Sequence, residues 1–247
     1  MASSETKKLV GKTALITGGS RGIGRAIAAA YVSAGARVFI CGRRATDLDR
    51  TLDEMRASGA VIDGAVGDVS SAQDVSRIVG AALKSFGAID VLVNNASILG
   101  PRTTIVDYPI DAWREVVEIN LTGIFLMTRA VLPGMLARRS GSIINLTSGV
   151  GRVGKAKWGA YAVSKAGVEG FTQVLADEVK SEGIRVNSVN PAATRTRMRA
   201  QAYPEEDPTT LPSPESITPI FLFLAADESV NITGQALNAR DWIGRRV

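Results

Sequence analysis

The chain has 247 residues, of which 45% are hydrophobic and 21% charged, a composition that suits one large α/β domain spanning residues 1–247. It contains no histidine and a single cysteine, Cys41, which excludes the usual zinc sites, a Ser-His-Asp triad and an internal disulfide. The net charge of +5 comes from scattered basic residues with few aromatics, which argues against nucleic-acid binding.

No segment of the sequence predicts a leader peptide or a membrane anchor. The first ten residues lack an apolar run, and the longest membrane-like stretch, Ile217–Ala226, is interrupted by Pro219. A spanning helix needs roughly 20 apolar residues. We therefore expect a cytoplasmic protein that contacts neither membranes nor nucleic acids and that has no metal site.

Short apolar runs alternate with longer amphipathic segments along the chain. Strands are predicted at Thr13–Thr17, Arg37–Cys41, Val61–Val66, Ile89–Val93, Ser142–Thr147 and Ile184–Val189. Helices are predicted at Gly22–Ser33, Asp47–Ala57, Gln73–Phe86, Asp111–Ala137, Trp158–Glu182 and Pro214–Ala226. This alternation indicates βαβ units, and therefore an α/β fold with a doubly wound parallel sheet of about seven strands and helices on both faces.

Several residues mark where these elements begin and end. Ser70 and Gln73 form a candidate capping box ahead of the third helix, and Gly35 is expected to end the first helix. Pro133 lies within the fourth predicted helix and should bend or restart it. The stretch 191–214 is rich in proline and threonine, and a loop of this length predicts a lid over a substrate site.

The first predicted strand leads into a glycine-rich turn that opens a helix. Gly18 allows a sharp turn, Gly22 lets backbone N–H groups approach a pyrophosphate, and Gly24 permits close helix–strand packing. The spacing G-x-x-x-G-x-G differs from the commonest dinucleotide fingerprint, and such turns also occur for purely steric reasons. The position in a βαβ unit favours dinucleotide binding by Gly18, Ser20, Arg21, Gly22, Ile23 and Gly24.

The end of the second predicted strand distinguishes the two nicotinamide dinucleotides. An NAD site usually places Asp or Glu there, whereas an NADP site carries Arg for the extra phosphate. Here Arg43 and Arg44 follow the strand, and Arg21 is a further candidate for that phosphate. A solvated helix start is the alternative, but the residues favour NADP(H) over NAD(H).

Asp68, next to Val69, either accepts a hydrogen bond from the adenine amino group or is a turn carboxylate.

One spacing predicts acid–base chemistry without histidine. Tyr161 and Lys165 are four residues apart, so on a helix they share one face and the ammonium can lie near the phenol. A fixed positive charge should lower the tyrosine's pKa from about 10 toward neutrality. Such a tyrosine can exchange a proton with a carbonyl or alcohol oxygen, and Ser148 would donate a hydrogen bond to the same oxygen.

With these motifs in order, the chain resembles the short-chain dehydrogenase/reductase family, and within it 3-oxoacyl-[acyl-carrier-protein] reductase-like members of the single-domain branch. The resemblance covers nearly the whole chain. Its motifs are Thr17-Gly18, Gly22-Ile23-Gly24, Asp68, Asn94-Asn95-Ala96, Asn120, Ser148, Tyr161-Ala162-Val163-Ser164-Lys165 and Asn190-Pro191. It implies a Rossmann-type fold and hydride transfer between a nicotinamide and a carbonyl or secondary alcohol.

The resemblance also implies a role for each matching residue. Tyr161 would be the catalytic acid–base, Lys165 its pKa-lowering partner, and Ser148 the anchor of the carbonyl oxygen. Asn120 would hold a water in a proton relay, although it could instead tie a helix kink to neighbouring backbone. The remaining cofactor contacts would come from Arg43, Arg44, Asp68, Val69, Asn95, Ala96, Pro191, Thr194 and Thr196, with Tyr161 and Lys165 beside the nicotinamide ribose.

The substrate pocket is expected where the segments after Ser148, near Ser97 and from the lid meet. A mostly apolar set lines it and suits a modest ketone: Ser97, Gly149, Val150, Val153, Trp158, Ala192, Ala193 and Met198. Basic residues gather in the same segments, including Arg195, Arg197 and Arg199, and they either steer an anionic substrate or form a solvated loop surface.

These observations predict an NADPH-dependent oxidoreductase that reversibly reduces a small ketone or a 3-oxoacyl group, as a homotetramer or homodimer. The alternative is a non-catalytic NADP(H)-binding sensor or scaffold. Arg138 and Arg139 lie where relatives that use acyl carrier protein often carry basic residues, but Glu182 stands where another is often found. Its negative charge would weaken docking of that acidic protein.

Two departures from the family pattern carry structural expectations. Ala192 replaces the glycine that usually follows the proline, so a flexible φ should be lost there. The segment Asn238–Trp242 replaces the usual ending of the last strand, a region that commonly contributes to a subunit interface. The case for a full tetramer is therefore weaker than for a typical member.

Overall fold

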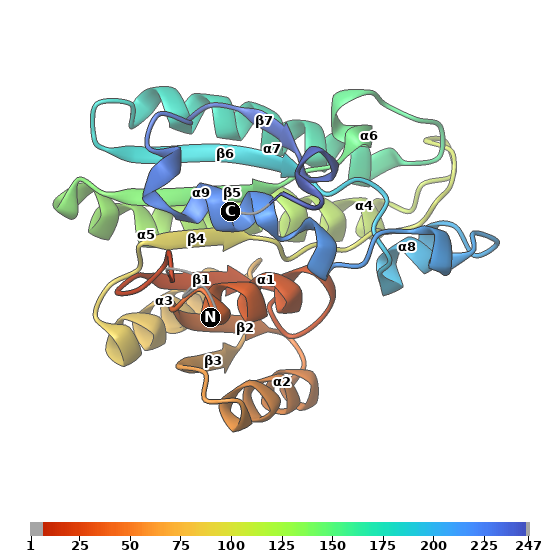
Figure 1. Cartoon of the computed structure of the whole chain (residues 1–247). Helices are drawn as coiled ribbons and strands as arrows, with labels where there is room; N and C mark the ends of the chain where they lie inside the picture. Colours follow the sequence, from red (N-terminus) through yellow and green to blue (C-terminus); the bar gives the residue numbers. More distant parts are fainter. Residues whose placement is uncertain (1–6, 246–247) are drawn as a thin grey trace.

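The computed structural model describes residues 7–245, which form alternating strands and helices (Figure 1). The strands are β1 (Thr13–Thr17), β2 (Arg37–Gly42), β3 (Ile62–Val66), β4 (Val91–Asn94), β5 (Gly141–Leu146), β6 (Ile184–Asn190) and β7 (Ala236–Asn238). The helices are α1 (Gly22–Ser33), α2 (Ala45–Ala57), α3 (Ala72–Phe86), α4 (Ile110–Val117), α5 (Gly123–Arg138), α6 (Gly149–Arg152), α7 (Gly159–Glu178), α8 (Arg197–Ala202) and α9 (Pro219–Ala225).

The strands form one parallel sheet in the order β3-β2-β1-β4-β5-β6-β7, which confirms the predicted doubly wound architecture. The chain winds outward from β1 in one direction and then returns past it to β4. The strand order therefore reverses between β1 and β4, and in open parallel sheets a ligand crevice lies at such a reversal, outside the carboxyl ends of the strands.

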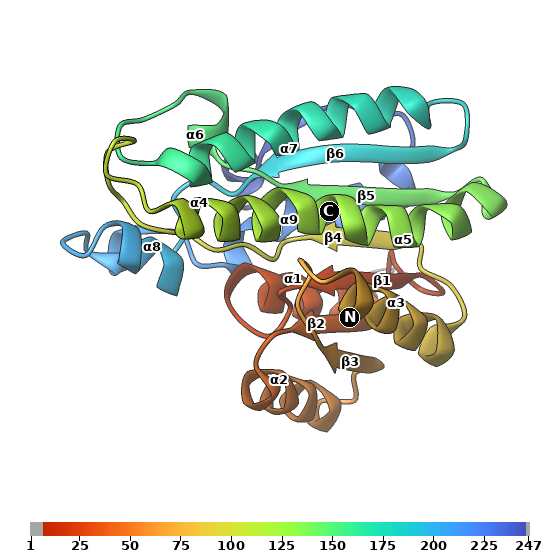
Figure 2. The same ribbon diagram turned by 180° about the vertical axis from the view of Figure 1, so that it is seen from behind.

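Helices cover both faces of the sheet, each over its own apolar core. On one face α1, α2 and α9 pack on the strands, with Ile27, Leu52 and Phe221 buried among them (Figure 1). On the other face lie α3, α5 and α7, seen in front of the sheet in Figure 2, around the buried Met127 and Leu175. Because both faces are dry, strands such as β1 are buried along their whole length.

The fourth predicted helix is interrupted, but not at its proline. A π-helical turn, Glu118–Thr122, separates α4 from α5, whereas α5 continues through Pro133 to Arg138. A restart of the helix at Pro133 is therefore wrong, and a bend there stays a prediction. The π turn contains Asn120, which contacts Ile98 in the segment after β4, and such turns often mark functional sites.

The same helical region corrects the expectation about apolar segments. Within residues 7–245, the stretch Ile110–Arg138 is long and apolar enough by length and composition to cross a membrane, whereas the apolar pattern of the sequence had singled out Ile217–Ala226. Its α5 portion packs against the sheet and α3, as a core helix does. Burial against the sheet accounts for part of this hydropathy, since 44% of the apolar window is buried and residues such as Phe125 stay exposed.

Several predicted boundaries move by a few residues. Ser71, not Ser70, caps α3, because its side chain accepts the backbone N–H of Asp74 at 3.2 Å. Gly35 ends the first helical segment as expected, with φ at 92°. The predicted helix Pro214–Ala226 is shorter, because α9 begins only at Pro219, where a missing N–H is harmless.

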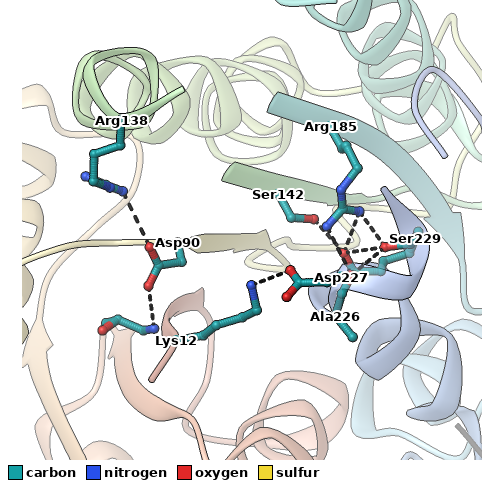
Figure 3. A network of polar contacts seen from close by, with 10 residues as sticks. Lys12, Asp90, Arg138, Ser142, Arg185, Ala226, Asp227 and Ser229 are labelled. Carbon is teal, nitrogen blue, oxygen red and sulfur yellow. Dashed lines mark hydrogen bonds and ion pairs between the residues drawn. The ribbon is translucent and has the colours of Figure 1, made fainter. Parts of the chain in front are cut away.

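Ion pairs and hydrogen bonds link the amino-terminal ends of the strands to the neighbouring helices (Figure 3). Asp90 accepts the backbone N–H of Thr13 at 2.8 Å and lies 3.7 Å from Arg138 of α5. Arg185 at the start of β6 donates to the carbonyl of Leu224 at 2.8 Å. These contacts hold helices of both faces to the sheet and leave the opposite edge for a ligand.

Candidate active site

A cleft of about 900 Å³ lies at the carboxyl ends of the strands, where the strand order reverses. Its walls come from the glycine-rich turn after β1, the segments that follow β2, β4 and β5, the start of α7, and the lid 191–214. The short helix α8 of the lid stands beyond this edge of the sheet (Figure 1). Segments far apart in the sequence therefore share one site.

The glycine-rich turn forms one end of the cleft. Gly18 and Gly22 both have positive φ, 64° and 54°, which glycine adopts without strain. A Cβ on Gly24 would lie 2.3 Å from the carbonyl oxygen of Gly18, so only glycine lets α1 approach the turn. Asn95 holds the turn in place by donating to the carbonyl of Thr17 at 2.8 Å. The backbone near Gly22 is thereby free to receive a phosphate group.

Arginines surround the cleft beside this turn. Arg43 lies 3.6 Å from Asp68, and Arg44 lies 2.9 Å from Asp47. Burial lowers the pKa of the Arg21 guanidinium, and the charge of Arg44 adds to that effect. Converging positive charge of this kind is complementary to a phosphate.

Asp68 adopts the turn geometry considered from its sequence position. One carboxylate oxygen accepts both the backbone N–H and the hydroxyl of Ser70, at 2.9 and 2.7 Å. Its other oxygen faces Arg43, and the residue still lines the cleft. Asp68 therefore has the turn role and also lines the cleft, so its contact with an adenine stays a prediction.

The proposed proton-transfer residues meet at the other end of the cleft. Ser148 follows β5 and is the N-cap residue of α6, while Tyr161 and Lys165 lie on successive turns of α7. The Lys165 ammonium lies 5.7 Å from the centre of the Tyr161 ring and donates to the carbonyl of Leu146 at 2.8 Å. All three side chains line the cleft.

The pKa of Tyr161 differs from the sequence-based expectation. Burial raises it to about 12, while the hydrogen bond with Ser148 acts in the opposite direction. Burial also lowers the pKa of Lys165 to about 8. The expected lowering of the Tyr161 pKa toward neutrality is therefore wrong for this geometry, because loss of hydration is the largest influence on that pKa. The Tyr161 hydroxyl is therefore protonated at pH 7.

Asn120 lies in the π-helical turn and is completely buried. Its side chain accepts the backbone N–H of Ile98 at 2.8 Å and donates to the carbonyl of the same residue at 2.9 Å. It also donates to Ser164, one residue before Lys165, at 3.2 Å. Asn120 thus ties the segment after β4 to α7, as the structural alternative anticipated, and it is not among the cleft-lining residues that the structure describes.

The substrate end of the cleft is apolar and aromatic. The Trp158 ring packs 5.5 Å from Tyr161 and 6.1 Å from Tyr203 of the lid, measured between ring centres. The Arg102 guanidinium lies over both Trp158 and Tyr203, at 4.7 and 4.9 Å, and joins the lid to the wall of the cleft. Ile98, Leu99, Met198 and Ala202 complete this end.

The predicted site residues divide clearly in the structure. Every predicted cofactor residue lines the cleft except Gly24, which packs beneath it. Among the predicted pocket residues, Ser97, Trp158, Ala192 and Met198 line the cleft. Four others are not among the lining residues within 7–245: Gly149, Val150, Val153 and Ala193. Val153 is 76% exposed, because α6 turns its outer end away from the cleft.

Ala192 keeps the backbone conformation that its glycine counterpart would have. Its φ is 58°, in the left-handed region, so the expected loss of this conformation is wrong. Asn190 supports the turn by accepting the N–H of Ala192 at 2.9 Å. A non-glycine residue held at positive φ stores strain beside the cleft.

The C-terminal segment closes against the residues that follow Ser148. Arg152 of α6 donates to Asn238 and Leu237 of β7, at 2.9 and 3.2 Å, and pairs with the buried Glu169 of α7 at 2.8 Å. Trp242 stacks 4.6 Å from Phe223 of α9. The unusual C-terminal segment therefore packs against its own subunit.

The sequence did not identify three contributors to the site. Arg102 and Tyr203 had no motif, and their contact depends on two loops that meet only in the fold. Arg197 was noted only as one of several basic lid residues, whereas the structure places it in the cleft lining beside Arg21. A positive residue directly after Thr196 was the only sequence signal for this role.

Comparison with known proteins agrees with this geometry. A family model described as short chain dehydrogenase matches residues 12–207. A 3-oxoacyl-[acyl-carrier-protein] reductase from Vibrio cholerae is 37% identical over 238 residues, covering 93% of this chain and 96% of its own.

Solved structures give the same result. The short chain dehydrogenase from Shigella flexneri has a TM-score of 0.91 and 35% identity, with 98% of this chain and 95% of the other covered. A variant of the actinorhodin polyketide ketoreductase, solved with NADPH, has a TM-score of 0.88 and 34% identity, covering 94% of this chain and 96% of its own. The chain belongs to the short-chain dehydrogenase family.

Proposed function

We propose that the protein is an NADPH-dependent carbonyl reductase that converts a ketone or a 3-oxoacyl group to a secondary alcohol. The observation that carries this proposal is one cleft with arginines at one end and Ser148, Tyr161 and Lys165 at the other. Support also comes from a relative that is a 3-oxoacyl-[acyl-carrier-protein] reductase and from a similar ketoreductase that was solved with NADPH.

The residues present fit an NADP cofactor better than NAD. The turn at Gly18 and Gly22 offers backbone N–H groups to a pyrophosphate, and Arg21, Arg43 and Arg44 offer charge to a further phosphate. The carboxylate that an NAD site usually places after β2 is replaced by arginine. The cleft is also large enough, at about 900 Å³, for a dinucleotide together with a small substrate.

In this proposal the protein positions the carbonyl and supplies its proton. NADPH, when bound in the cleft, would supply the hydride that the carbonyl carbon accepts. Ser148 donates a hydrogen bond to the carbonyl oxygen, and the Tyr161 hydroxyl transfers its proton to that oxygen as negative charge develops there. Lys165 stabilises the resulting phenolate, since it remains mostly protonated below its pKa of about 8. Trp158 excludes water from the reacting end.

The pKa of Tyr161 favours the reductive direction at neutral pH. With a pKa of about 12, the hydroxyl keeps the proton that reduction consumes. Alcohol oxidation instead needs the phenolate, which is scarce at pH 7. We therefore expect reduction to dominate near neutrality and oxidation to increase as the pH is raised.

We favour a free small ketone over a carrier-bound substrate. Arg138 already donates to the carbonyl of Ile89 at 2.7 Å, and Arg139 pairs with Glu182 at 2.8 Å. Both arginines that could attract acidic acyl carrier protein are thus engaged within the molecule. Their available positive field is reduced, and an encounter with an acidic partner depends on that field.

We also propose that the single domain assembles with copies of itself through α5 and α7. A shallow apolar groove of about 290 Å³ between these helices is lined by residues that include Phe125, Leu132 and Phe171. Phe125 is 46% exposed, and Leu136 of the same groove is 36% exposed. Apolar helix faces of this kind are typical of homodimer interfaces. Light scattering of the purified protein tests this assignment.

Following NADPH oxidation with a panel of ketones tests the activity, and Tyr161→Phe tests the assigned proton donor. We expect the variant to retain NADPH binding and to lose about 100-fold or more in kcat. Tyr108→Phe is the matched control, because the Tyr108 hydroxyl is buried with no hydrogen-bond partner among the described residues. Undiminished turnover in Tyr161→Phe would remove Tyr161 from its role.

Two further results would redirect the proposal. Tight NADPH binding without turnover on any carbonyl would favour a sensor or scaffold. If Arg43→Asp does not weaken NADPH binding relative to NADH, the assignment of the arginine end to the extra phosphate is wrong.

A further inference from the structure

The lid reaches the cofactor end of the cleft as well as the substrate end. A Cβ on Gly22 of the glycine-rich turn would lie 3.9 Å from the Thr196 methyl group of the lid. Thr196 caps α8 by accepting the N–H of Arg199 at 3.1 Å, and Arg197 is the first residue of that helix. Arg197 lines the cleft together with Arg21, Arg43 and Arg44.

Arg21 and Arg197 differ from the other arginines of the cleft. Arg43, Arg44 and Arg199 each have a carboxylate partner, namely Asp68, Asp47 and Glu206. Within residues 7–245, neither Arg21 nor Arg197 has a carboxylate oxygen within 4.0 Å. The two come from different segments, and the positive charge of Arg197 contributes to lowering the pKa of Arg21. The charge of Asp47 also acts on Arg21, but Asp47 is already paired with Arg44 and Arg50, so an anion between Arg21 and Arg197 would relieve the repulsion between them.

We propose that Arg197 is a specificity-determining residue, which binds the 2′-phosphate of NADP(H) together with Arg21 and so brings the lid onto the cofactor. The inference rests on the proposed function, because it assumes an NADP cofactor. A 2′-phosphate carries between one and two negative charges and accepts several hydrogen bonds. NAD(H) has a hydroxyl at that position and leaves the repulsion between Arg21 and Arg197 in place.

The lid is arranged so that this contact matters for the substrate site. Arg199 and Glu206 form a two-bond ion pair, with both distances 2.5 Å, that keeps α8 and the following turn as one unit. Tyr203, which lies between Arg199 and Glu206 in the chain, packs against Arg102 and Trp158. A phosphate at Arg197 therefore fixes a segment whose other end forms the wall of the substrate pocket. NADP(H) binding should order this wall, and NAD(H) binding should do so less.

Binding constants for NADPH and NADH, measured by the fluorescence of the reduced nicotinamide, test the proposal without turnover. We expect Arg197→Gln to weaken NADPH binding about 10-fold or more, as loss of a charge-assisted contact does, and to change NADH binding less than about twofold. Arg195→Gln is the matched control, because Arg195 is an exposed lid arginine that does not line the cleft among the described residues. It should leave both constants nearly unchanged.

Limited proteolysis gives a second readout of the lid. A glutamate-specific protease can cut after the exposed Glu205, and the Arg197 substitution leaves that cutting site intact. In the unsubstituted protein, saturating NADPH should slow this cleavage more than saturating NADH does. In Arg197→Gln the difference between the two cofactors should disappear.

The outcomes separate this inference from the proposed function. Equal weakening of NADPH and NADH binding by Arg197→Gln would place the residue at the pyrophosphate and overturn the assignment to the 2′-phosphate. Unchanged binding of both cofactors would show a solvated side chain and also overturn it. If the unsubstituted protein itself fails to prefer NADPH, the proposed cofactor is wrong, and the lid inference falls with it.

Discussion

Replacing Lys165 by methionine should abolish most of the reductase activity without a comparable loss of stability. It should also change how the free energy of unfolding depends on pH. Lys165 is only 2% exposed, and burial lowers the pKa of its ammonium to about 8 from the usual value near 10.5. At about 1.4 kcal/mol per pH unit, keeping this charge inside the fold costs about 3 kcal/mol at neutral pH. Methionine fills a similar volume without the charge.

The pH dependence of this cost has a definite sign. Between about pH 8 and pH 10 the unfolded chain still binds the lysine proton while the folded protein has released it, so wild-type stability rises with pH. Lys165→Met lacks this contribution. The stability of the wild type relative to the variant should therefore increase by about 2 to 3 kcal/mol across that range.

At pH 7 a second contribution opposes the gain from removing the charge. The variant loses the bond to the carbonyl of Leu146, which costs about 1 to 3 kcal/mol when that carbonyl is left unpaired. The free energy of unfolding at pH 7 should thus change little or rise modestly, while reductase activity falls by about 100-fold or more.

Urea unfolding at several pH values, followed by circular dichroism, measures these differences. Lys155→Met is a suitable control, because Lys155 is an exposed lysine whose nitrogen lies 3.4 Å from the Tyr203 hydroxyl. Parallel stability curves for wild type and Lys165→Met between pH 8 and pH 10 would refute the assignment of a buried, pKa-shifted ammonium.

Three further substitutions test other features. Ala192→Gly should change the free energy of unfolding by less than about 1 kcal/mol, because relief of left-handed strain offsets added chain freedom, whereas Ala192→Val should lower it by about 1 to 3 kcal/mol in urea melts. Arg185→Met removes the bond to Ser229 at the distant sheet edge (Figure 3), so stability should fall by about 1 to 3 kcal/mol while KM for NADPH stays constant. Gly151→Ala would place a Cβ 2.6 Å from the Lys165 backbone, so kcat should fall about 10-fold or more in a protein whose circular dichroism is unchanged.

Much of the fold could be predicted because its signals are local. The strands near Thr13, Arg37 and Ser142 are short apolar runs, and both faces of a parallel sheet require such runs. The glycine-rich turn was recognisable because close approach of α1 to β1 admits only glycine at Gly24. The four-residue spacing of Tyr161 and Lys165 followed from helix geometry in the same direct way.

Boundaries inside the long helical regions were harder to predict. No residue type in Glu118–Thr122 predicts the π-helical turn found there. Pro133, in contrast, predicted an interruption of the helix where none occurs. Packing of α5 against the sheet and against α3 compensates for the missing N–H, so tertiary contacts override the local preference.

The sequence by itself determined the order of the elements and most of the residues that line the cleft, including Ser148, Tyr161 and Lys165. Only the tertiary structure decided how those groups behave. The pKa of Tyr161 depends on dehydration by Trp158 and the surrounding chain, and the place of Arg197 beside Arg21 depends on how a loop far along the sequence folds back. The dehydration of a side chain and the distance between two charges depend on contacts between segments that are far apart in the sequence. The sequence pattern alone does not give those distances.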